Sequence, residues 1–310
     1  MRVGPVRGDV STMGTVIEPI QATSFALLSD FDECRRLHKH FGTTYFFASQ
    51  RFPLEIRDKV HALYGFVRVP DEIVDAAGSE NRSERMSDFR RQLIQGYEGV
   101  RPEYAVLRAF VDVATSSGIP LEEPLIFLDA MEADISKHRY ADYGELKHYM
   151  RGSAASVGLM MCYLFGISEN PVAMKGAEAL GEAMQLTNFL RDVGEDVGRG
   201  RIYLPLDELA MFRVPEQDVL DGRVTAEFVE LMKFQIDRAH ALYRQAEACI
   251  PLLPGYAQAP VMIALRLYER ILDRIVRRNF DVFSGRARTS RFEKVSVALG
   301  VVVGHKVGKL

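Results

Sequence analysis

The chain contains little cysteine and almost no excess of charge, and these two shortages exclude several classes of protein. Its 310 residues include only Cys34, Cys162 and Cys249, which lie far apart, so we expect neither a disulfide framework nor a cysteine-based metal site. The net charge of −3 and the pI of about 6.2 provide no basic field to attract nucleic acid. We therefore expect a cytoplasmic protein of a reducing compartment with no nucleic-acid partner.

Long apolar runs and leader segments are also missing. The longest weakly polar run covers residues 152–167 and is rich in Gly, Ala and Ser. A membrane-spanning helix needs about 20 apolar residues, so this shorter run predicts a buried, closely packed helix. The first residues do not form a secretory signal, and residues 1–20 have no periodicity, which predicts a disordered N-terminus.

The sequence also lacks the alternation of apolar and polar residues that is typical of strands, and it has no fixed repeat and no evident linker. Its apolar residues follow a helical spacing instead. Apolar residues recur three and four positions apart, as along Val60, Leu63, Tyr64 and Val67. About ten helices account for this pattern, and their packing makes the core. We predict an all-α protein with one helical domain over 21–294 and a C-terminal tail over 295–310.

Several boundaries follow from proline and glycine. Pro70 should kink or restart the helix that begins after Pro53. We expect one or two helices over 143–165. Long helices over 228–249 and 262–283 should be separated by a Pro- and Gly-rich loop between them.

The most informative polar pattern is a row of side chains on one predicted helix. Asn188, Asp192 and Asp196 recur every four residues and so lie on one face, with Gln185 nearly in line. Carboxylates stacked in this way repel each other unless a positive group lies beside them. Mg²⁺ suits this role because it takes oxygen ligands, typically one or two carboxylates plus phosphate oxygens.

A second acidic group, Asp71, Glu72 and Asp75, lies far earlier in the chain, and two of its members are again four residues apart. Two such helices facing each other across a cavity would hold metal ions that bind a diphosphate and stabilise its departure. The alternative is that each pair lies on a solvated helix face and is offset by lysine or arginine. Two pairs in one chain favour the functional interpretation.

Both acidic groups lie in longer motifs with a family resemblance. Residues 63–75, Leu-Tyr-Gly-Phe-Val-Arg and then Asp-Glu-Ile-Val-Asp, resemble the first aspartate-rich motif of the squalene/phytoene synthase family. Residues 185–196, followed by Gly-Arg-Ile-Tyr-Leu-Pro at 200–205, resemble the second. The similarity spans about residues 38–295. Residues 42–45 and 149–154 resemble the bacterial phytoene synthase branch in particular.

The resemblance implies a fold and a reaction. The fold is an isoprenoid-synthase-type helical bundle around a central cavity. The reaction is a head-to-head condensation of two prenyl diphosphates, dependent on Mg²⁺ or Mn²⁺, through an allylic cation and a cyclopropyl diphosphate. Two geranylgeranyl diphosphates would give phytoene for carotenoid biosynthesis, whereas two farnesyl diphosphates would give dehydrosqualene or a squalene precursor. No NADPH is expected.

The resemblance also implies roles for individual residues. The residues expected to bind metal are Asp71, Glu72, Asp75, Asn188, Asp192 and Asp196, of which the four aspartates are also catalytic together with Tyr268. The residues expected to bind substrate are Tyr45, Tyr64, Arg68, Tyr149, Gln185, Asn188, Arg191 and Arg286. Glu72 stands where many relatives have Asp, and Thr43 where many have a basic residue, so Arg68 would bind more of the diphosphate.

Cations in a dry cavity require aromatic faces, and Phe46 and Phe189 join the tyrosines named above as candidates. Each of these rings, taken singly, is also explained as a plain core residue. Arginines spaced by four from Arg266 to Arg278 fit an ion-paired, solvated helix face. Arg201, which borders the second motif, shares the expected diphosphate contact.

The apolar C-terminal residues 295–310, which include two lysines, allow two interpretations. They would form a frayed or core-docked tail, or they would make a peripheral membrane contact, since the implied substrates are lipids. Two non-enzymatic alternatives also stay open, namely an assembly protein that has kept the fold and a helical lipid-associating protein. An assembly protein of this kind would be expected to have lost the acidic residues, whereas this chain keeps both aspartate pairs.

Overall fold

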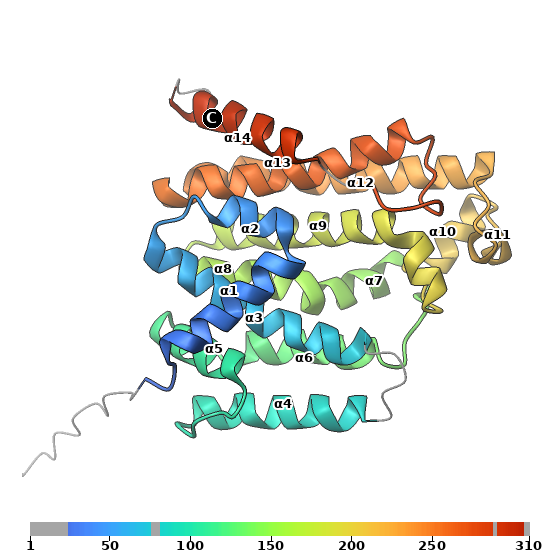
Figure 1. Cartoon of the computed structure of the whole chain (residues 1–310). Coiled ribbons are helices and arrows are strands. Elements are labelled where there is room, and N and C mark those ends of the chain that lie inside the picture. The colour runs from blue at the N-terminus through green and yellow to red at the C-terminus, as the bar shows by residue number, and fades with distance from the viewer. Residues whose placement is uncertain (1–23, 76–80, 288–289, 307–310) are drawn as a thin grey trace, which may run out of the picture.

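The computed structural model describes residues 24–75, 81–287 and 290–306, and within these ranges every regular element is a helix (Figure 1). The all-α prediction is therefore confirmed. The N-terminal segment 1–20, for which disorder is predicted, lies outside the described residues. The helices are α1 (Leu28–Phe41), α2 (Thr43–Ser49), α3 (Leu54–Asp75), α4 (Arg82–Tyr97), α5 (Ala105–Ser116), α6 (Glu122–Ala133), α7 (Tyr143–Met150), α8 (Ser156–Leu164), α9 (Pro171–Gly198), α10 (Leu206–Met211), α11 (Glu216–Leu220), α12 (Ala226–Cys249), α13 (Gly255–Arg277) and α14 (Arg291–Lys306).

Helix α9 is the central element of the bundle and packs against α8, α12 and α13 (Figure 1). Its start is well specified by sequence. The Asn170 side chain accepts hydrogen bonds from the backbone N–H groups of Val172 and Ala173, and Pro171 occupies the first helical position, where its missing N–H has no partner to lose. This helix carries the polar row that begins near Gln185.

Close packing of residues 154–158 on α9 depends on two glycines, one in α8 and one in α9. A Cβ atom at Gly158 would lie 2.4 Å from the carbonyl oxygen of Ala177, and one at Gly181 would lie 2.7 Å from the carbonyl oxygen of Ala154. Neither distance is compatible with a side chain. The weakly polar run 152–167 is therefore a buried helical segment, as its composition predicts.

Helix α3 carries the first acidic group and packs against α1, α4, α5 and α6. The expectation that Pro70 restarts the helix is wrong, because α3 continues through this residue to Asp75. Proline removes one intrahelical hydrogen bond and crowds the preceding turn. Burial of Pro70 and of its neighbours Ile73 and Val74 outweighs this cost and keeps the helix intact.

Two other boundaries differ from the predicted ones. The segment 143–165 consists of α7, a π-helical turn at Arg151–Ala155 and α8. A Cβ at Gly152 in this turn would lie 2.6 Å from the Cβ of Ala130, so the wider turn lets the chain approach α6. The predicted loop 250–260 is shorter, because α13 starts at Gly255 and includes the buried Pro260.

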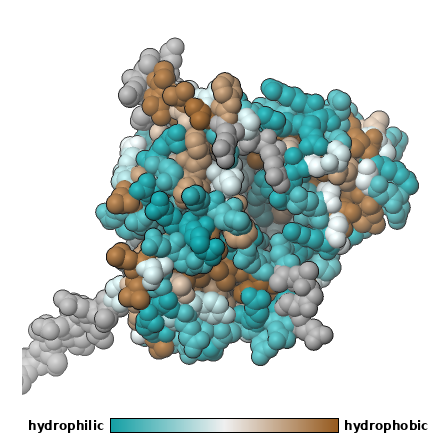
Figure 2. Space-filling view, viewed as in Figure 1, coloured by the Kyte–Doolittle hydropathy of each residue, from teal (hydrophilic) through white to brown (hydrophobic). Residues whose placement is uncertain are grey.

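Residues at the C-terminus form α14, so the domain boundary expected between 294 and 295 lies inside a helix. One face of α14 is docked on α13 and α2 and buries Val297 and Val301. The other face exposes 82% of Phe292, 61% of Leu299 and 59% of Val303. Figure 2 shows hydrophobic surface at the upper left, where α14 lies in Figure 1. None of the described helices is long and apolar enough to cross a membrane.

Candidate active site

A cavity of about 660 Å³ lies within the bundle, and residues of α3 and α9 line it together with residues of α2, α8 and α13. Asp71 and Asp75 reach it from α3, and Asn188, Asp192 and Asp196 reach it from α9. The two acidic rows, far apart in sequence, therefore share one cavity. Most of its remaining lining is aromatic or aliphatic, with several arginines beside the carboxylates.

Asp192 is the most strongly bound carboxylate of the α9 row. Arg191 donates two hydrogen bonds to it at 2.7 and 2.6 Å, and Arg286 donates two more, both at 2.7 Å. Burial would raise the pKa of Asp192, but these two guanidinium groups hold it below its usual range. Arg286 also lies 3.0 Å from Glu195. Arg191 and Arg286, two of the arginines predicted to bind diphosphate, thus converge on one carboxylate.

The other polar groups of the α9 row lack strong partners. Asn188 donates to Gln185 at 3.3 Å, while its own Oδ1 atom is buried with no hydrogen-bond partner among the described residues. Burial, together with the negative charge of Asp192, raises the pKa of Asp196 to about 7. An uncompensated acceptor and a destabilised carboxylate, one turn on either side of Asp192, are the surroundings in which a cation is stabilised.

The α3 row is organised by Arg68, which donates to Asp71 and, at 3.1 Å, to Glu72. The guanidinium group of Arg68 also lies 3.9 Å from the ring centre of Phe41, a cation–π contact that fixes its position. Burial raises the pKa of Asp71 despite this pairing, although Asp71 still exposes 45% of its side chain. Glu72 is not among the described residues that line the cavity, and so it contributes through Arg68.

Asp75 at the end of α3 joins the two rows. Arg199 donates to it at 2.9 Å and Arg201 at 3.1 Å. Both arginines belong to the segment that follows α9, so the loop of the second motif closes on the carboxylate of the first. Arg201 therefore lies in the site, as predicted, while Arg199 is a member that the motif comparison did not single out.

Tyr45 and Tyr268 form one aromatic wall of the cavity. Their ring centres are 4.7 Å apart, and the Tyr45 hydroxyl donates to the sulfur of Met184 at 3.4 Å. Burial raises the pKa of Tyr268, so its phenol stays neutral. The wall thus presents polarisable faces and no titratable charge at neutral pH.

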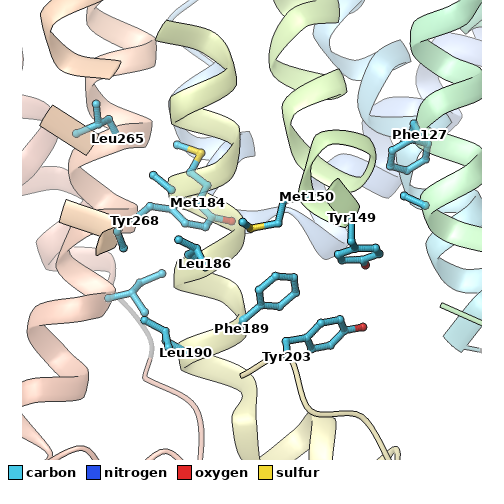
Figure 3. Close-up of a cluster of buried hydrophobic side chains, with 14 of the residues drawn as sticks. Phe127, Tyr149, Met150, Met184, Leu186, Phe189, Leu190, Tyr203, Leu265 and Tyr268 are labelled. Atoms are coloured by element: carbon cyan, nitrogen blue, oxygen red, sulfur yellow. The ribbon is translucent and has the colours of Figure 1, made fainter. Parts of the chain in front are cut away.

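A second aromatic wall consists of Tyr149, Phe189 and Tyr203 (Figure 3). The rings of Phe189 and Tyr203 are stacked 4.2 Å apart, and those of Tyr149 and Tyr203 lie 5.8 Å apart. The hydroxyl groups of Tyr149 and Tyr203 both donate to Asp134, at 2.5 and 3.2 Å. Tyr149 was predicted here, whereas Tyr203 was only part of a motif.

A buried histidine pair supports a further aromatic residue of the lining, Tyr64. The Nδ1 atoms of His38 and His61 are 2.8 Å apart, and burial lowers the pKa of His38 to about 3 and that of His61 to about 4. Both rings are therefore neutral at physiological pH. The ring of Tyr64 is stacked on His38 at 4.1 Å, which holds Tyr64 against the cavity.

Other predicted residues lie elsewhere. Phe46 is not among the described lining residues and is stacked on His61. On α13, Arg266 pairs with Glu247 and Glu269, and Arg274 pairs with Glu293. This part of the arginine row is therefore an ion-paired face outside the cavity.

Asp134 and His38 are cavity residues that sequence reasoning missed. Asp134 follows α6 without a second acid at helical spacing on the same face, and His38 is one of several polar residues on α1. Neither belongs to a motif, and no local signal marks them. Arg199 and Tyr203 had a usable signal, because both lie within or beside the second motif.

The donor set fits a divalent cation only in combination with a bound anion. Among the described residues, no three His, Cys, Asp or Glu side chains lie close enough to form a metal site by themselves. The carboxylates of Asp71, Asp75 and Asp192 each pair with arginine in this structure. Asp196, Asp71 and the free Oδ1 of Asn188 are oxygen donors of the type that Mg²⁺ takes when phosphate oxygens complete its shell.

Comparison with known proteins agrees with this site. The squalene/phytoene synthase family matches residues 38–293. A phytoene synthase from Arthrospira platensis is 36% identical over 290 residues, covering 89% of this chain and 94% of the relative. A 15-cis-phytoene synthase from Synechococcus elongatus is 34% identical over 285 residues, covering 88% of this chain and 92% of the relative.

The fold has a counterpart among solved structures. A dehydrosqualene synthase in complex with ligand superimposes with a TM-score of 0.84 at 26% identity, covering 90% of this chain and 97% of that chain. This similarity confirms the helical bundle around a cavity that the two motifs predict. By sequence match, motif geometry and fold together, the chain belongs to the squalene/phytoene synthase family of prenyltransferases.

Proposed function

We propose that this enzyme condenses two molecules of geranylgeranyl diphosphate head to head to form phytoene, by way of a cyclopropyl diphosphate, for carotenoid biosynthesis. The observation that carries the proposal is the single cavity that brings Asp71 and Asp75 to the same space as Asp192 and Asp196. Such a space combines a polar end for diphosphate with a largely apolar remainder for isoprenoid chains. The similarity to phytoene synthases over most of the chain supports the same reaction.

Membership of this family implies a divalent metal ion, and we propose Mg²⁺, with Mn²⁺ as a substitute. Asp71, Asp75, Asn188, Asp192 and Asp196 would hold it, since their oxygens share the cavity. When bound, the ion would neutralise charge on the diphosphate and so favour cleavage of the C1–O bond. Glu72 stands beside this set and acts through Arg68.

The arginines position the substrates. Arg68, Arg191 and Arg286 are already directed at carboxylates in the cavity. Arg191 and Arg286 each bind Asp192 through two nitrogens, and guanidinium groups bind phosphate oxygens in the same bidentate manner. A diphosphate that enters the cavity can therefore compete for these donors. Gln185 adds an amide to the same polar end.

The aromatic walls exclude water and stabilise positive charge. Tyr45 and Tyr268 on one side, and Tyr149 and Phe189 on the other, line the cavity. A ring face attracts a cation more strongly where water is absent. Met161 and the small residues of α8 add an apolar surface for the isoprenoid chains.

Competition between the two substrate lengths tests the proposal. Purified enzyme is given equal amounts of geranylgeranyl and farnesyl diphosphate with Mg²⁺, and the products are analysed by mass spectrometry. We expect phytoene as the main product. A predominance of dehydrosqualene would replace the proposed substrate by farnesyl diphosphate, and absence of pyrophosphate release with either substrate would exclude the enzyme reaction.

We also propose that the protein works in the cytoplasm and touches a membrane through α14. The exposed Phe292, Leu299 and Val303 lie on one face of this helix, and the proposed substrates and product are lipids. Leu299→Asp should weaken sedimentation with vesicles that contain anionic lipid, whereas Met211→Asp, at an exposed site on α10, should not. Equal sedimentation of both variants would contradict the membrane contact.

A further inference from the structure

Asp134 is a buried carboxylate outside both acidic motifs. It follows the last residue of α6 and exposes 5% of its surface, yet it borders the cavity. Burial of a carboxylate is unfavourable unless charged or hydrogen-bonding partners compensate it. Among the described residues, no cation is paired with its carboxylate oxygens, and Arg201 instead donates to its main-chain carbonyl oxygen at 3.2 Å. The partners of this carboxylate are two phenols.

The two phenols come from different parts of the chain. Tyr149 is on α7 and donates to Oδ2 at 2.5 Å, while Tyr203 follows α9 and donates to Oδ1 at 3.2 Å. Their hydroxyl oxygens lie on the same side of the aromatic group, with the Phe189 ring beside them (Figure 3). One carboxylate therefore sets the orientation of two of the three rings in this wall.

The same carboxylate also brings negative charge close to the cavity. Burial raises the pKa of Asp134 to about 6, against the lowering effects of Tyr149 and Arg201, so the group is largely ionised at neutral and alkaline pH. A fixed charge in a water-poor site acts on nearby positive charge more strongly than it would in water. The negative charge of Asp134 therefore adds to the attraction that the ring faces exert on a cation in the cavity.

Arg201 couples this wall to the first acidic row. It donates to the main-chain oxygen of Asp134 and, through its other terminal nitrogen, to Asp75 at 3.1 Å. The side chain is itself buried. The position of Asp134 is thus tied to the end of the cavity that holds the carboxylates.

We propose that Asp134 is a positioning residue of the condensation reaction, which holds the phenols of Tyr149 and Tyr203 in the cavity wall and stabilises the positive charge that forms beside them. The inference rests on the proposed function. It assigns a role to a residue that neither motif contains.

The test compares Asp134→Asn with Asp129→Asn, a matched change at an exposed aspartate on α6, the helix that ends just before Asp134. For Asp134→Asn we expect kcat to fall about 100-fold, in the range found when one preorganised electrostatic group is removed. KM should change by less than about threefold, because uniform substrate binding is retained. Asp129→Asn should behave as the wild type in both constants.

A double-mutant cycle with Tyr149→Phe separates positioning from a purely structural role. If Asp134 acts through this phenol, the double variant should lose little more activity than the worse single variant. If the losses of activity in the two single variants add up in the double variant, Asp134 does not act through the Tyr149 phenol. Should Asp134→Asn unfold, Tyr203→Phe keeps the carboxylate and the ring, and we expect its kcat to fall about tenfold; an unchanged kcat would overturn the proposal.

The two proposals fail in different ways. If the wild type releases no pyrophosphate from either prenyl diphosphate, the proposed function is wrong and the role of Asp134 falls with it. If the wild type is active and Asp134→Asn matches it in kcat, only the role of Asp134 is wrong.

Discussion

Replacing Asp192 by asparagine removes the charge that holds two arginines in the cavity. Asp192, Arg191 and Arg286 expose 11%, 17% and 33% of their side chains, so the group is mostly buried but reaches solvent at Arg286. Removing one partner of a fully buried pair costs about 3–5 kcal/mol, and a solvated pair is worth about 0–1 kcal/mol. For this intermediate case we expect the free energy of unfolding to fall by about 2 kcal/mol.

The charge of Asp196 reduces this loss. The negative charge of Asp192 contributes to the raised pKa of Asp196, so the variant relieves one repulsion while it leaves two guanidinium groups short of a partner. A loss of about 2 kcal/mol corresponds to a decrease of about 4 °C in Tm for a chain of this size. Turnover should fall at least about 100-fold, since the residue contacts the proposed diphosphate site.

The pH dependence of this effect has a defined sign. The pKa of Asp192 is lowered in the folded protein, so its stabilisation is present above the usual aspartate pKa. It is lost as pH falls through the lowered value. The difference in Tm between wild type and Asp192→Asn should therefore be largest near neutral pH and should shrink below about pH 4.

The assay is thermal unfolding followed by circular dichroism without metal, from acid to neutral pH. Asp129→Asn serves as the control, because Asp129 exposes 66% of its side chain and loss of its ion pair should cost less than about 1 kcal/mol. Adding pyrophosphate should raise the Tm of Asp192→Asn more than that of the wild type, since the anion can bind the released arginines. Equal Tm values for the two variants at neutral pH would refute the reasoning.

Three further outcomes are expected. Asp71→Ala should lower turnover severely, by at least about 100-fold, while its circular dichroism stays near that of the wild type; a near-normal rate would remove Asp71 from the site. Gly158→Ala should destabilise the protein by about 1–3 kcal/mol through overpacking, because its Cβ would meet a backbone oxygen at 2.4 Å. Gly255→Ala, with open space around it, should leave Tm unchanged in the same scan. Since burial raises the pKa of Asp196 to about 7, the folded state binds the extra proton and the wild type should lose stability from about pH 4 to pH 7 relative to Asp196→Asn. Parallel Tm curves for these two proteins would contradict that assignment.

Local sequence determined the helices and the two acidic rows. The spacing of Asn188, Asp192 and Asp196 places them on one face in any α-helix, and the cap at Asn170 with Pro171 marks where α9 begins. These are short-range properties of the backbone. The family resemblance followed from the same residues.

Tertiary packing decided which groups meet. Arg286 reaches Asp192 across 94 positions of sequence, and Arg201 reaches Asp75 across 126. Asp134 joins Tyr149 and Tyr203 although no motif contains all three. Contacts of this kind depend on how distant helices pack. They cannot be predicted from the residues that are adjacent in the sequence.

Tertiary packing also explains why the helix boundaries predicted near two prolines differ from those in the structure. Pro70 and Pro260 favour a break when judged by backbone preference alone, but both are buried inside continuous helices. Local preference amounts to about 3 kcal/mol for a proline in a helix, and burial of several neighbouring apolar side chains is worth more. The sequence by itself thus determined the helical chemistry of the site, and only the packed structure decided its partners, because packing energies sum over residues far apart in the chain.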